Sequence, residues 1–405
     1  MGAVKRLRLL LGALALVLVA AACGSEALED SAAPAEGTSA PAVADDAADA
    51  ADVAEDAQDA EDTAESDVDA VEEPAESEEP APETTTTTTT EAPAVEQQSF
   101  GPVSLTPACT NLPDVSVGLS TEVLTSGGNE YNYQFTVPSS YDGSPLPVVL
   151  DFHGIGSNGA QQAVFSGWSA AAEAEGFLSV QPTGLMVDGD DRASWELPQF
   201  ETPVRNDIQF VVDLIDVVSS QICIDPARIY STGMSNGGLF TSTVVCVLSE
   251  RIAAAVSVAG VTHHESCSPT RAVPYLAFHG TDDAVVPFNG GGESALDGTD
   301  GSSEFFEQVI PEEFAEFADS SGCSGSTDSE ITPEVTLTSY SGCDDDVPLG
   351  FYTIEGGGHT WPGSSISAAI PTLGVTNLDI SATEIAWEFF SQHTLGGEPA
   401  ADSAG

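Results

Sequence analysis

Short apolar runs alternate with helical segments along most of this chain, and that order constrains its fold more than any other feature. Apolar runs typical of strands lie at residues 147–152, 177–181, 228–232, 253–258, 275–278, 334–340 and 351–354. Helical periodicity is found at residues 160–175, 207–222, 239–248 and 382–390, and Asn206 and Asp207 are candidate caps. Apolar strands that alternate with helices indicate an α/β fold with a doubly wound, mostly parallel sheet.

Two earlier strands differ because they alternate polar and apolar residues. They are expected at residues 117–124 and 130–137, with the turn-forming sequence Ser-Gly-Gly-Asn at residues 126–129 between them. An N-terminal antiparallel hairpin should therefore precede the parallel strands. In open α/β sheets the chemistry lies beyond the carboxyl ends of the strands, so residues that directly follow strands are the candidates for function.

The first 22 residues predict export from the cytoplasm. Three basic residues precede an apolar run at residues 9–19, which is too short for a bilayer and is followed by small residues. Three alanines before Cys23 resemble a bacterial lipobox, in which the cysteine is lipidated and becomes the new N-terminus. An ordinary cleaved signal with an incidental cysteine is the alternative. We expect an extracellular protein in either case, anchored by lipid at the outer face of the cell membrane in the first.

Residues 23–100 have the composition of a linker. From Gly24 to Phe100 the chain contains 24 acidic residues and no Lys or Arg. Such a tract cannot bury enough apolar surface to offset chain entropy, so a disordered acidic stalk is expected. The threonine run at residues 84–90 would suit glycosylation, although a solvated linker explains it equally well. Residues 101–396 carry apolar periodicity and are long enough for one domain with a sizeable core, and residues 397–405 form a short polar tail.

The charge balance excludes nucleic acid as a partner. The chain has 65 Asp and Glu against 8 Lys and Arg, a formal net charge of −57, and no lysine follows Lys5. Nothing in such a chain could neutralise phosphates. Solubility or adaptation to salt explains the acidic surface. For the oligomeric state, a monomer is the default expectation.

Six cysteines follow Cys23, an even number that suits an oxidising compartment and predicts three disulfides. Cys323 and Cys343 flank a short segment and can pair locally. Cys223 and Cys246 lie at the two ends of a strand-helix unit, and both ends should lie at the same edge of the sheet. Cys109 and Cys267 are then left to pair with each other. The predicted pairs are Cys323–Cys343, Cys223–Cys246 and Cys109–Cys267. No C-x-x-C or H-x-x-x-H spacing is present, so no metal site is predicted.

Residues 233–238, Gly-Met-Ser-Asn-Gly-Gly, contain a G-x-S-x-G motif between a predicted strand and a predicted helix. A glycine on each side allows the strained turn that lifts a serine hydroxyl above a parallel sheet. Ser235 is therefore a candidate nucleophile. Because a serine hydroxyl is a poor nucleophile at neutral pH, it needs a base and an orienting acid. The motif also arises by chance, so these partners decide its meaning.

Histidines and aspartates follow later strands. His359 lies in a glycine-rich loop directly after a strand and is the candidate base, and Asp282 and Asp283 follow another strand and are candidates for the acid. The order Ser, Asp, His along the chain is that of α/β hydrolases. His263 and His264 are rival bases. His393 is interpreted as a surface residue, and His279 is interpreted as support for the acid loop.

Backbone N–H groups would stabilise an oxyanion at such a site. The sequence His153-Gly154-Ile155-Gly156 directly follows a strand, where these folds supply one donor, here the N–H of Ile155. The residue after the nucleophile, Asn236, supplies the other. His153 precedes the serine in the chain and is interpreted as a structural residue that packs this loop.

The stretches HGIGSNG, CIDPARIYSTGMSNGG, IAAAVSVAG, HGTDDAVVPF and GGGHTWPG occur in this order. They resemble the secreted polyhydroxybutyrate depolymerase and feruloyl esterase group of α/β hydrolases, which includes actinobacterial lipoproteins. The similarity covers about residues 115–393, and the last stretch is its most specific part. The resemblance implies Ser235 as nucleophile, Asp283 as acid and His359 as base, with no cofactor. The group usually has a non-acidic residue before this aspartate and proline after it, where Asp282 and Ala284 stand here, so the choice of aspartate stays open.

The resemblance also implies a substrate class and a pocket. Ester hydrolysis is expected on 3-hydroxybutyrate-type polyesters or on aryl and feruloyl-polysaccharide esters, with Trp195 and Trp361 in the acyl pocket. Nothing after the domain looks like a polymer-binding module, which favours soluble oligomers or small esters. The alternatives are a cell-surface binding protein with a catalytically idle hydrolase fold, and a peptidase with the same triad. Contact with a membrane is expected only through the N-terminal lipid.

Overall fold

The computed structural model describes residues 100, 104–186, 192–197, 205–264, 267–291 and 308–396. The chain divides into two units, Met1–Thr86 and Thr87–Gly405, and every described residue belongs to the second. The predicted signal, Cys23, the linker up to residue 99 and the tail at 397–405 lie outside the described residues. Within the described ranges, every helix is too short or too polar to span a membrane.

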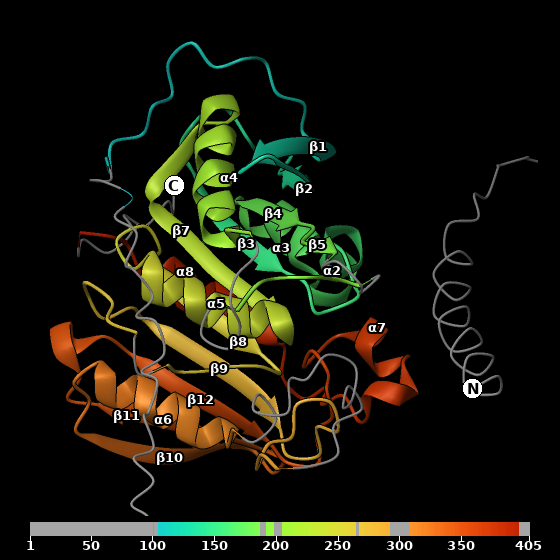
Figure 1. The fold of residues 1–405 in the computed structure, drawn as a ribbon, viewed down its shortest axis with the longest axis vertical. Coiled ribbons are helices and arrows are strands. Elements are labelled where there is room, and N and C mark those ends of the chain that lie inside the picture. Colours follow the sequence, from blue (N-terminus) through green and yellow to red (C-terminus); the bar gives the residue numbers. More distant parts are fainter. Residues whose placement is uncertain are drawn as a thin grey trace, which may run out of the picture. The chain divides into compact units, whose positions relative to one another are not determined.

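A ten-stranded sheet forms the centre of the described unit (Figure 1). Its six central strands are parallel, and an antiparallel pair is added at each edge. In spatial order the strands are β1 (Gly118–Ser126), β2 (Asn129–Val137), β4 (Leu178–Pro182), β3 (Leu146–Phe152), β7 (Ile224–Met234), β8 (Ala254–Val258), β9 (Tyr275–Gly280), β12 (Leu349–Ile354), β11 (Val335–Ser341) and β10 (Gly325–Thr332). A separate short pair consists of β5 (Leu185–Met186) and β6 (Ala193–Ser194).

Helices cover both faces of the sheet, because its central strands are apolar on both. In β3, Val148 and Leu150 belong to one core cluster and Val149 to the other. The first cluster is covered by α4 (Asp207–Gln221), α5 (Asn236–Val247) and α6 (Ile310–Ser320). The second is covered by α2 (Gly159–Ser166), α3 (Trp168–Glu175) and α8 (Ala382–Ser391). This is the doubly wound α/β-hydrolase architecture that the sequence predicts.

Most of the predicted elements are confirmed within one to four residues of their expected ends. The hairpin is present as β1 and β2, joined by Gly127 and Gly128, which both have positive φ. Asn206 caps α4 by accepting a hydrogen bond from the N–H of Gln209 at 2.9 Å. The register of the parallel strands brings the ends of β7, β9 and β12 to one edge of the sheet.

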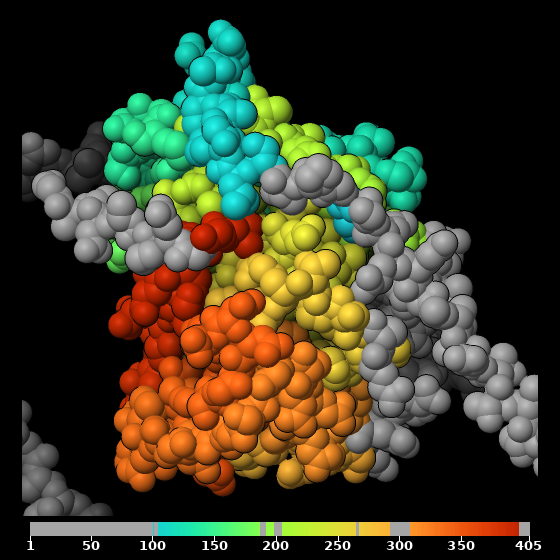
Figure 2. Space-filling model, turned by 90° about the vertical axis from the view of Figure 1, so that its left-hand side faces the viewer, coloured from blue at the N-terminus to red at the C-terminus, as the bar shows by residue number. Residues whose placement is uncertain are grey.

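Two local expectations fail for physical reasons. The single helix predicted at residues 160–175 is two helices, because Gly167 adopts a left-handed conformation with φ of 77° and ends α2. The edge strand β10 and the helix α6 before it were not predicted. Nearly every residue of β10 is exposed and polar, so it lacks the apolar pattern of the central strands. Figure 2 shows this orange-coloured part of the chain, which includes α6, β10 and β11, as one block.

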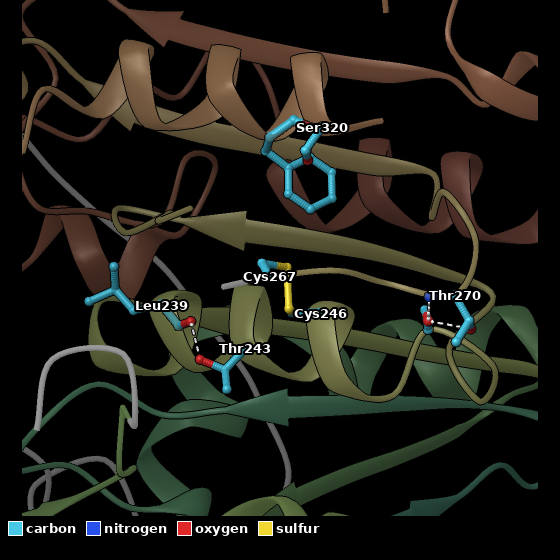
Figure 3. The surroundings of a disulfide bond; sticks show 8 residues. Leu239, Thr243, Cys246, Cys267, Thr270 and Ser320 are labelled. Carbon is cyan, nitrogen blue, oxygen red and sulfur yellow. Dashed lines mark hydrogen bonds between the residues drawn. A yellow bond between two sulfur atoms is a disulfide. The ribbon is translucent and has the colours of Figure 1, made fainter. Parts of the chain in front are cut away.

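Two of the three predicted disulfides are wrong. Cys323–Cys343 is confirmed. The structure pairs Cys109 with Cys223, and Cys246 with Cys267, in place of Cys223–Cys246 and Cys109–Cys267. Sheet topology predicts the edge at which a strand begins or ends, but not which neighbour faces a cysteine there. The described part of the connection from β8 to β9 has no helix and returns along α5, where Ser249 Oγ lies 3.0 Å from Thr270 Oγ1 and Cys267 lies over Cys246 (Figure 3).

Asp151 is a buried acid within the apolar strand β3. Gln162 Nε2 donates to its Oδ1 at 2.8 Å, and Ser166 Oγ lies 2.7 Å from its Oδ2 and 2.8 Å from the Gln162 carbonyl. Burial raises the pKa of Asp151 to about 7, although these hydrogen bonds oppose the shift. A protonated Asp151 can donate to Ser166 Oγ, which then donates to the Gln162 carbonyl, so the neutral acid satisfies every group. The cluster ties α2 to β3.

Asp151→Asn should stabilise the protein at alkaline pH and leave it almost unchanged at pH 4. The unfolded carboxyl titrates near pH 4 and the folded one near pH 7, so ionisation destabilises the fold increasingly over that interval. Asn reproduces the hydrogen bonds of the neutral acid. Urea unfolding at pH 8 should show a gain on the order of 2–4 kcal/mol. Asp142→Asn, at an exposed acid, is the matched control and should give no gain. Equal destabilisation by Asp151→Asn at both pH values would contradict this account.

Candidate active site

Ser235 lies at the tight turn between β7 and α5, as the G-x-S-x-G motif predicts. Its φ of 57° and ψ of −125° fall in a region that non-glycine residues rarely occupy. Its N–H donates to the Val258 carbonyl at 2.9 Å, and its carbonyl accepts the N–H of Leu239 at 2.9 Å, so hydrogen bonds on both sides hold the turn. Strain retained in this way is typical of functional residues.

The glycines of the motif are required by close backbone approach. A Cβ on Gly233 would lie 2.4 Å from the Gly237 carbonyl oxygen, and a Cβ on Gly237 would lie 2.1 Å from that of Phe152. Gly238 packs equally closely, because its Cβ would lie 2.5 Å from the carbonyl oxygen of Gly260. Only residues without a side chain let α5 begin this near to β3 and β8. The three glycines therefore fix where the serine stands.

His359 and Asp283 form a buried pair beyond the carboxyl ends of β12 and β9. His359 Nδ1 donates to Asp283 Oδ2 at 2.8 Å, and both side chains are nearly inaccessible to solvent. Burial raises the pKa of Asp283, but the adjacent imidazoles of His359 and His279 more than offset it, so its pKa lies below the ordinary value. Asp283 is therefore ionised near neutral pH, and its Oδ2 accepts the hydrogen bond from His359 Nδ1.

The structure favours Asp283 over Asp282 as the partner of the histidine. Asp283 Oδ1 accepts the N–H groups of Val285 and Val286, both at 2.8 Å, which turns Oδ2 toward His359. Asp282 is exposed, and its N–H donates to the Gly357 carbonyl at 2.9 Å.

His279 supports this acid loop, as predicted. Its Nε2 donates to the Val286 carbonyl at 2.9 Å and lies 3.4 Å from Asp283 Oδ2. Burial lowers the pKa of His279, which keeps its ring neutral, although the charge of Asp283 opposes the shift. The His279 ring thus lies beside the Asp283 carboxylate as a neutral group, and it does not form a second ion pair with it.

The loop of His359 is held against the acid loop by close backbone contact. A Cβ on Gly280 would lie 2.1 Å from the Gly357 carbonyl oxygen, and the Gly356 N–H donates to Thr281 Oγ1 at 2.8 Å. Within the described residues, Ser235 Oγ makes no hydrogen bond to His359. Catalytic hydrogen bonds are often absent before substrate binds, so this geometry is compatible with proton transfer in a complex.

The two predicted oxyanion donors lie beside Ser235. A Cβ on Gly154 would lie 3.1 Å from Ser235 Cβ and 3.6 Å from its Oγ, so the loop that carries Ile155 packs on the serine. Asn236 is the first residue of α5, where a backbone N–H has no partner inside the helix. Among the described residues, neither the Ile155 nor the Asn236 N–H donates a hydrogen bond, and both remain free for a ligand.

His153 fixes the orientation of the oxyanion loop. Its Nδ1 donates to the Gly154 carbonyl at 2.7 Å, and its Nε2 accepts the N–H of Gly184 at 2.9 Å. Burial lowers its pKa to about 4, so the ring stays neutral and keeps this tautomer. Because the peptide between residues 154 and 155 is planar and trans, holding its carbonyl also fixes the opposite direction of the Ile155 N–H.

One segment that the sequence did not reveal connects the two donors. The Asn236 side chain accepts the Trp195 N–H at 2.7 Å and donates to the Trp195 carbonyl at 3.1 Å. In the same segment, the Ala193 carbonyl accepts the Gly156 N–H at 2.8 Å, and Trp195 Nε1 donates to the His153 carbonyl at 3.0 Å. Residues 193–195 therefore bind both the Ile155 loop and the start of α5. The Asn at the second x of G-x-S-x-G was the available sequence signal.

The predicted pocket role of the two tryptophans is not supported. Trp195 is 1% exposed and packs on Phe152 and Phe240, with ring centroids 5.2 and 5.1 Å away. Trp361 is also 1% exposed, and its Nε1 donates to Thr383 Oγ1 at 2.9 Å. Both rings are core residues that pack beneath the catalytic loops, and neither ring has an exposed aromatic surface that a substrate could contact.

The rival histidines lie elsewhere. His263 is half-buried against α6, where its N–H donates to Glu313 Oε2 at 2.7 Å, and neither it nor His264 pairs with Asp283. His393 packs on Phe389 at the end of α8. No group of three or more His, Cys, Asp or Glu side chains that could hold a metal ion occurs in the described part of the chain.

Comparison with known proteins gives a consistent set of relatives, although no family model matches. In structure, the chain is similar to the acetyl xylan esterase from Aspergillus awamori, with a TM-score of 0.44 and 15% identity over 67% of this chain and 98% of that one. In sequence, it is 31% identical to feruloyl esterase B of Piromyces equi over 228 residues, which are 55% of this chain and 41% of that protein. It is 28% identical to poly(3-hydroxyalkanoate) depolymerase C of Paucimonas lemoignei over 160 residues, 39% of this chain and 38% of the depolymerase. The chain is a relative of the two enzymes that it matches in sequence.

The resemblance to the polyhydroxybutyrate depolymerase and feruloyl esterase group is thereby confirmed. The chain spans less than half the length of either sequence relative. The serine, aspartate and histidine that the resemblance selected are those that the structure places at the carboxyl edge of the sheet.

Asp283→Asn should reduce ester turnover by about 10⁴, because the amide can no longer hold the reactive tautomer of His359 or stabilise its protonated form. Asp282→Asn is the matched control, since this neighbour is exposed, and its kcat should stay within about twofold of wild type. Steady-state hydrolysis of a p-nitrophenyl ester measures both. A larger loss from Asp282→Asn than from Asp283→Asn would reverse the assignment.

Proposed function

We propose that this chain is an exported serine carboxylic-ester hydrolase that acts through a Ser235–His359–Asp283 triad. The hydrogen bond between His359 Nδ1 and Asp283 Oδ2 at the carboxyl edge of the sheet carries this proposal. It occurs in a fold whose strained turn presents a serine at that same edge, next to two free backbone donors. Base, acid, nucleophile and oxyanion donors are together the complete set that acyl transfer needs.

The first half of the reaction forms an acyl-enzyme. His359 Nε2 accepts the proton of Ser235 Oγ as the oxygen attacks the ester carbonyl carbon, and the C=O electron pair moves to the carbonyl oxygen. The N–H groups of Ile155 and Asn236 donate to this oxyanion. The ionised Asp283 stabilises the imidazolium. Collapse of the intermediate breaks the ester C–O bond, and the imidazolium gives its proton to the departing alkoxide, which leaves as an alcohol.

The second half hydrolyses the acyl-enzyme. Water gives a proton to His359 Nε2 and attacks the acyl carbonyl carbon, and the same two N–H groups receive the second oxyanion. Collapse then breaks the bond to Ser235 Oγ, which takes back the proton from the imidazolium as the carboxylic acid leaves. The cycle regenerates the starting enzyme, and no cofactor enters it.

The described cysteines support export. All six of them form disulfides, which persist in oxidising compartments outside the cytoplasm. A signal at residues 1–22 and lipidation at Cys23 would place the enzyme at the outer face of the cell membrane. The relatives support the proposed substrate class, which is aryl esters or aliphatic polyesters, because one is named a feruloyl esterase and another a poly(3-hydroxyalkanoate) depolymerase.

Ser235→Ala should lower hydrolysis of p-nitrophenyl acetate by about 10⁶ and abolish covalent labelling by a fluorophosphonate. Ser231→Ala is the matched control, because Ser231 is a buried serine on β7, the strand that leads to Ser235, and its hydroxyl donates to Thr241 Oγ1 within the described residues. That control should keep labelling and near wild-type turnover. Absence of labelling in the wild-type enzyme would identify an idle binding protein. Cleavage of peptides without cleavage of esters would identify a peptidase.

A further inference from the structure

The segment that joins the two proposed oxyanion donors is itself held by a buried ion pair. Arg205 Nε donates to Asp207 Oδ1 at 2.9 Å, and the two side chains are 5% and 1% exposed. Arg205 directly precedes the N-cap of α4, and Asp207 is the first residue of that helix. Burial lowers the pKa of Arg205, but the hydrogen bond and the charge of Asp207 more than offset this effect, so its pKa lies above the ordinary value. The guanidinium therefore stays charged.

The ion pair binds the two peptide groups on either side of Trp195. Arg205 Nη2 donates to the Ser194 carbonyl at 2.6 Å, and the Glu196 N–H donates to Asp207 Oδ2 at 2.8 Å. The Ser194 carbonyl shares its peptide group with the Trp195 N–H. The Glu196 N–H shares the next peptide group with the Trp195 carbonyl.

The Asn236 side chain binds the other ends of the same two peptide groups. It accepts the Trp195 N–H at 2.7 Å and donates to the Trp195 carbonyl at 3.1 Å. Because a trans peptide group is planar, its N–H and C=O point in opposite directions, and fixing one of them fixes the other. Both peptide groups are therefore held between the ion pair on one side and Asn236 on the other. A movement of either partner is passed directly to the opposite one.

This arrangement reaches both proposed oxyanion donors. Asn236 supplies one of them from its own backbone, so its N–H and its side chain are joined through a single Cα. The Ala193 carbonyl accepts the Gly156 N–H at 2.8 Å, directly after Ile155, which supplies the other. Within the described residues, no hydrogen bond joins the ion pair to a side chain of the triad. Any effect of the pair on the reaction must therefore pass through the backbone around Trp195.

Two further buried groups hold the ion pair in place. The Tyr131 hydroxyl, on β2, donates to Asp207 Oδ1 at 2.8 Å. Glu196 accepts the Arg205 N–H with both carboxyl oxygens, at 3.0 and 3.1 Å. A buried ion pair adds little stability beyond that of well-packed apolar side chains, because desolvation offsets the attraction. The directed bonds to the Trp195 backbone are what this network provides and apolar packing would not.

We propose that Arg205 and Asp207 are positioning residues that set the Asn236 and Ile155 N–H groups where the oxyanion of the acyl-transfer intermediate needs them. This inference rests on the proposed function and adds to it two residues that do not touch the substrate. Loss of the pair should weaken stabilisation of the transition state, because the donors shift. Substrate binding and proton transfer to the base should stay largely unchanged.

Arg205→Lys tests this role, because lysine keeps the positive charge but lacks the planar guanidinium that binds Asp207 and the Ser194 carbonyl together. It should lower kcat and kcat/KM for p-nitrophenyl acetate equally, by about 10- to 100-fold, since complete loss of one oxyanion donor costs about 10² to 10³. The pKa in the pH profile of kcat/KM, which reports the base, should not move. Inhibition by an alkyl trifluoromethyl ketone, whose hemiketal oxyanion needs the same donors, should weaken by a similar factor.

Arg228→Lys is the matched control. Arg228 also binds an aspartate and a backbone carbonyl, because its Nε donates to Asp225 Oδ2 at 2.7 Å and its Nη2 donates to the Pro145 carbonyl at 3.3 Å. It lies in the first half of β7, whereas Ser235 follows the last residue of that strand. The control should therefore match the wild type in turnover, pH profile and inhibition.

The route through the backbone is tested with Asn236→Ala, which keeps the N–H of this residue and removes its two bonds to Trp195. Because Arg205 and Asn236 hold the same peptide groups, the loss in the double variant should be at least about threefold smaller than the product of the two single losses. Losses that simply multiply would show that Arg205 acts by another route and would overturn the proposal.

Turnover is expressed per serine labelled by a fluorophosphonate, so that unfolded enzyme is not counted. If Arg205→Lys does not fold, Asp207→Asn takes its place, because the amide keeps the size of the side chain and loses its charge and one acceptor oxygen. The same equal fall in kcat and kcat/KM is expected. A raised KM with unchanged kcat, or a loss no larger than that of Arg228→Lys, would refute the positioning role in an active esterase. A wild-type enzyme without esterase activity would refute the proposed function, and this inference with it.

Discussion

The backbone conformation of Ser235 is the constraint on which the rest of this structure depends. A φ of 57° with a ψ of −125° costs on the order of 1–3 kcal/mol, and the surroundings must hold it. Glycines at 233, 237 and 238 allow the start of α5 to approach β7, β3 and the end of β8 closely enough to do so. The same approach brings the Gly154 backbone against the serine and begins α5 at Asn236. The positions of the proposed nucleophile and of the two proposed oxyanion donors therefore follow from a single packing arrangement.

Neutral hydrogen-bonded groups hold this arrangement in an otherwise acidic molecule. His153 and His279 are buried and uncharged, and each orients one loop of the site by a bond to a backbone carbonyl. Asn236 binds the backbone of Trp195 in both directions. Asp283, by contrast, is a buried carboxylate whose pKa lies below its ordinary value, and it accepts the hydrogen bond from His359.

Local patterns predicted the elements and the catalytic set, because a strand apolar on both faces, a G-x-S-x-G turn and a glycine-rich histidine loop each reflect a local requirement. The predictions that failed concern which segments and side chains lie next to each other in the folded chain. The partners of Cys223 and Cys246 could not be found from strand edges alone, since two chain segments meet the same edge. Trp195 and Trp361 stand in the predicted segments, but their rings turn into the core. The bonds of Asn236 to Trp195 join residues 41 apart in the chain, which no periodicity records.

Direct detection of the acyl-enzyme tests the central claim that Ser235 performs acyl transfer. The enzyme would be mixed with p-nitrophenyl acetate, quenched with acid during turnover, digested and analysed by mass spectrometry. The account predicts one acetyl group per molecule, on the peptide that contains Ser235, with its accumulation preceding steady release of acetate. Steady hydrolysis with the acetyl group on another residue, or with none on Ser235 at any quench time, would contradict it.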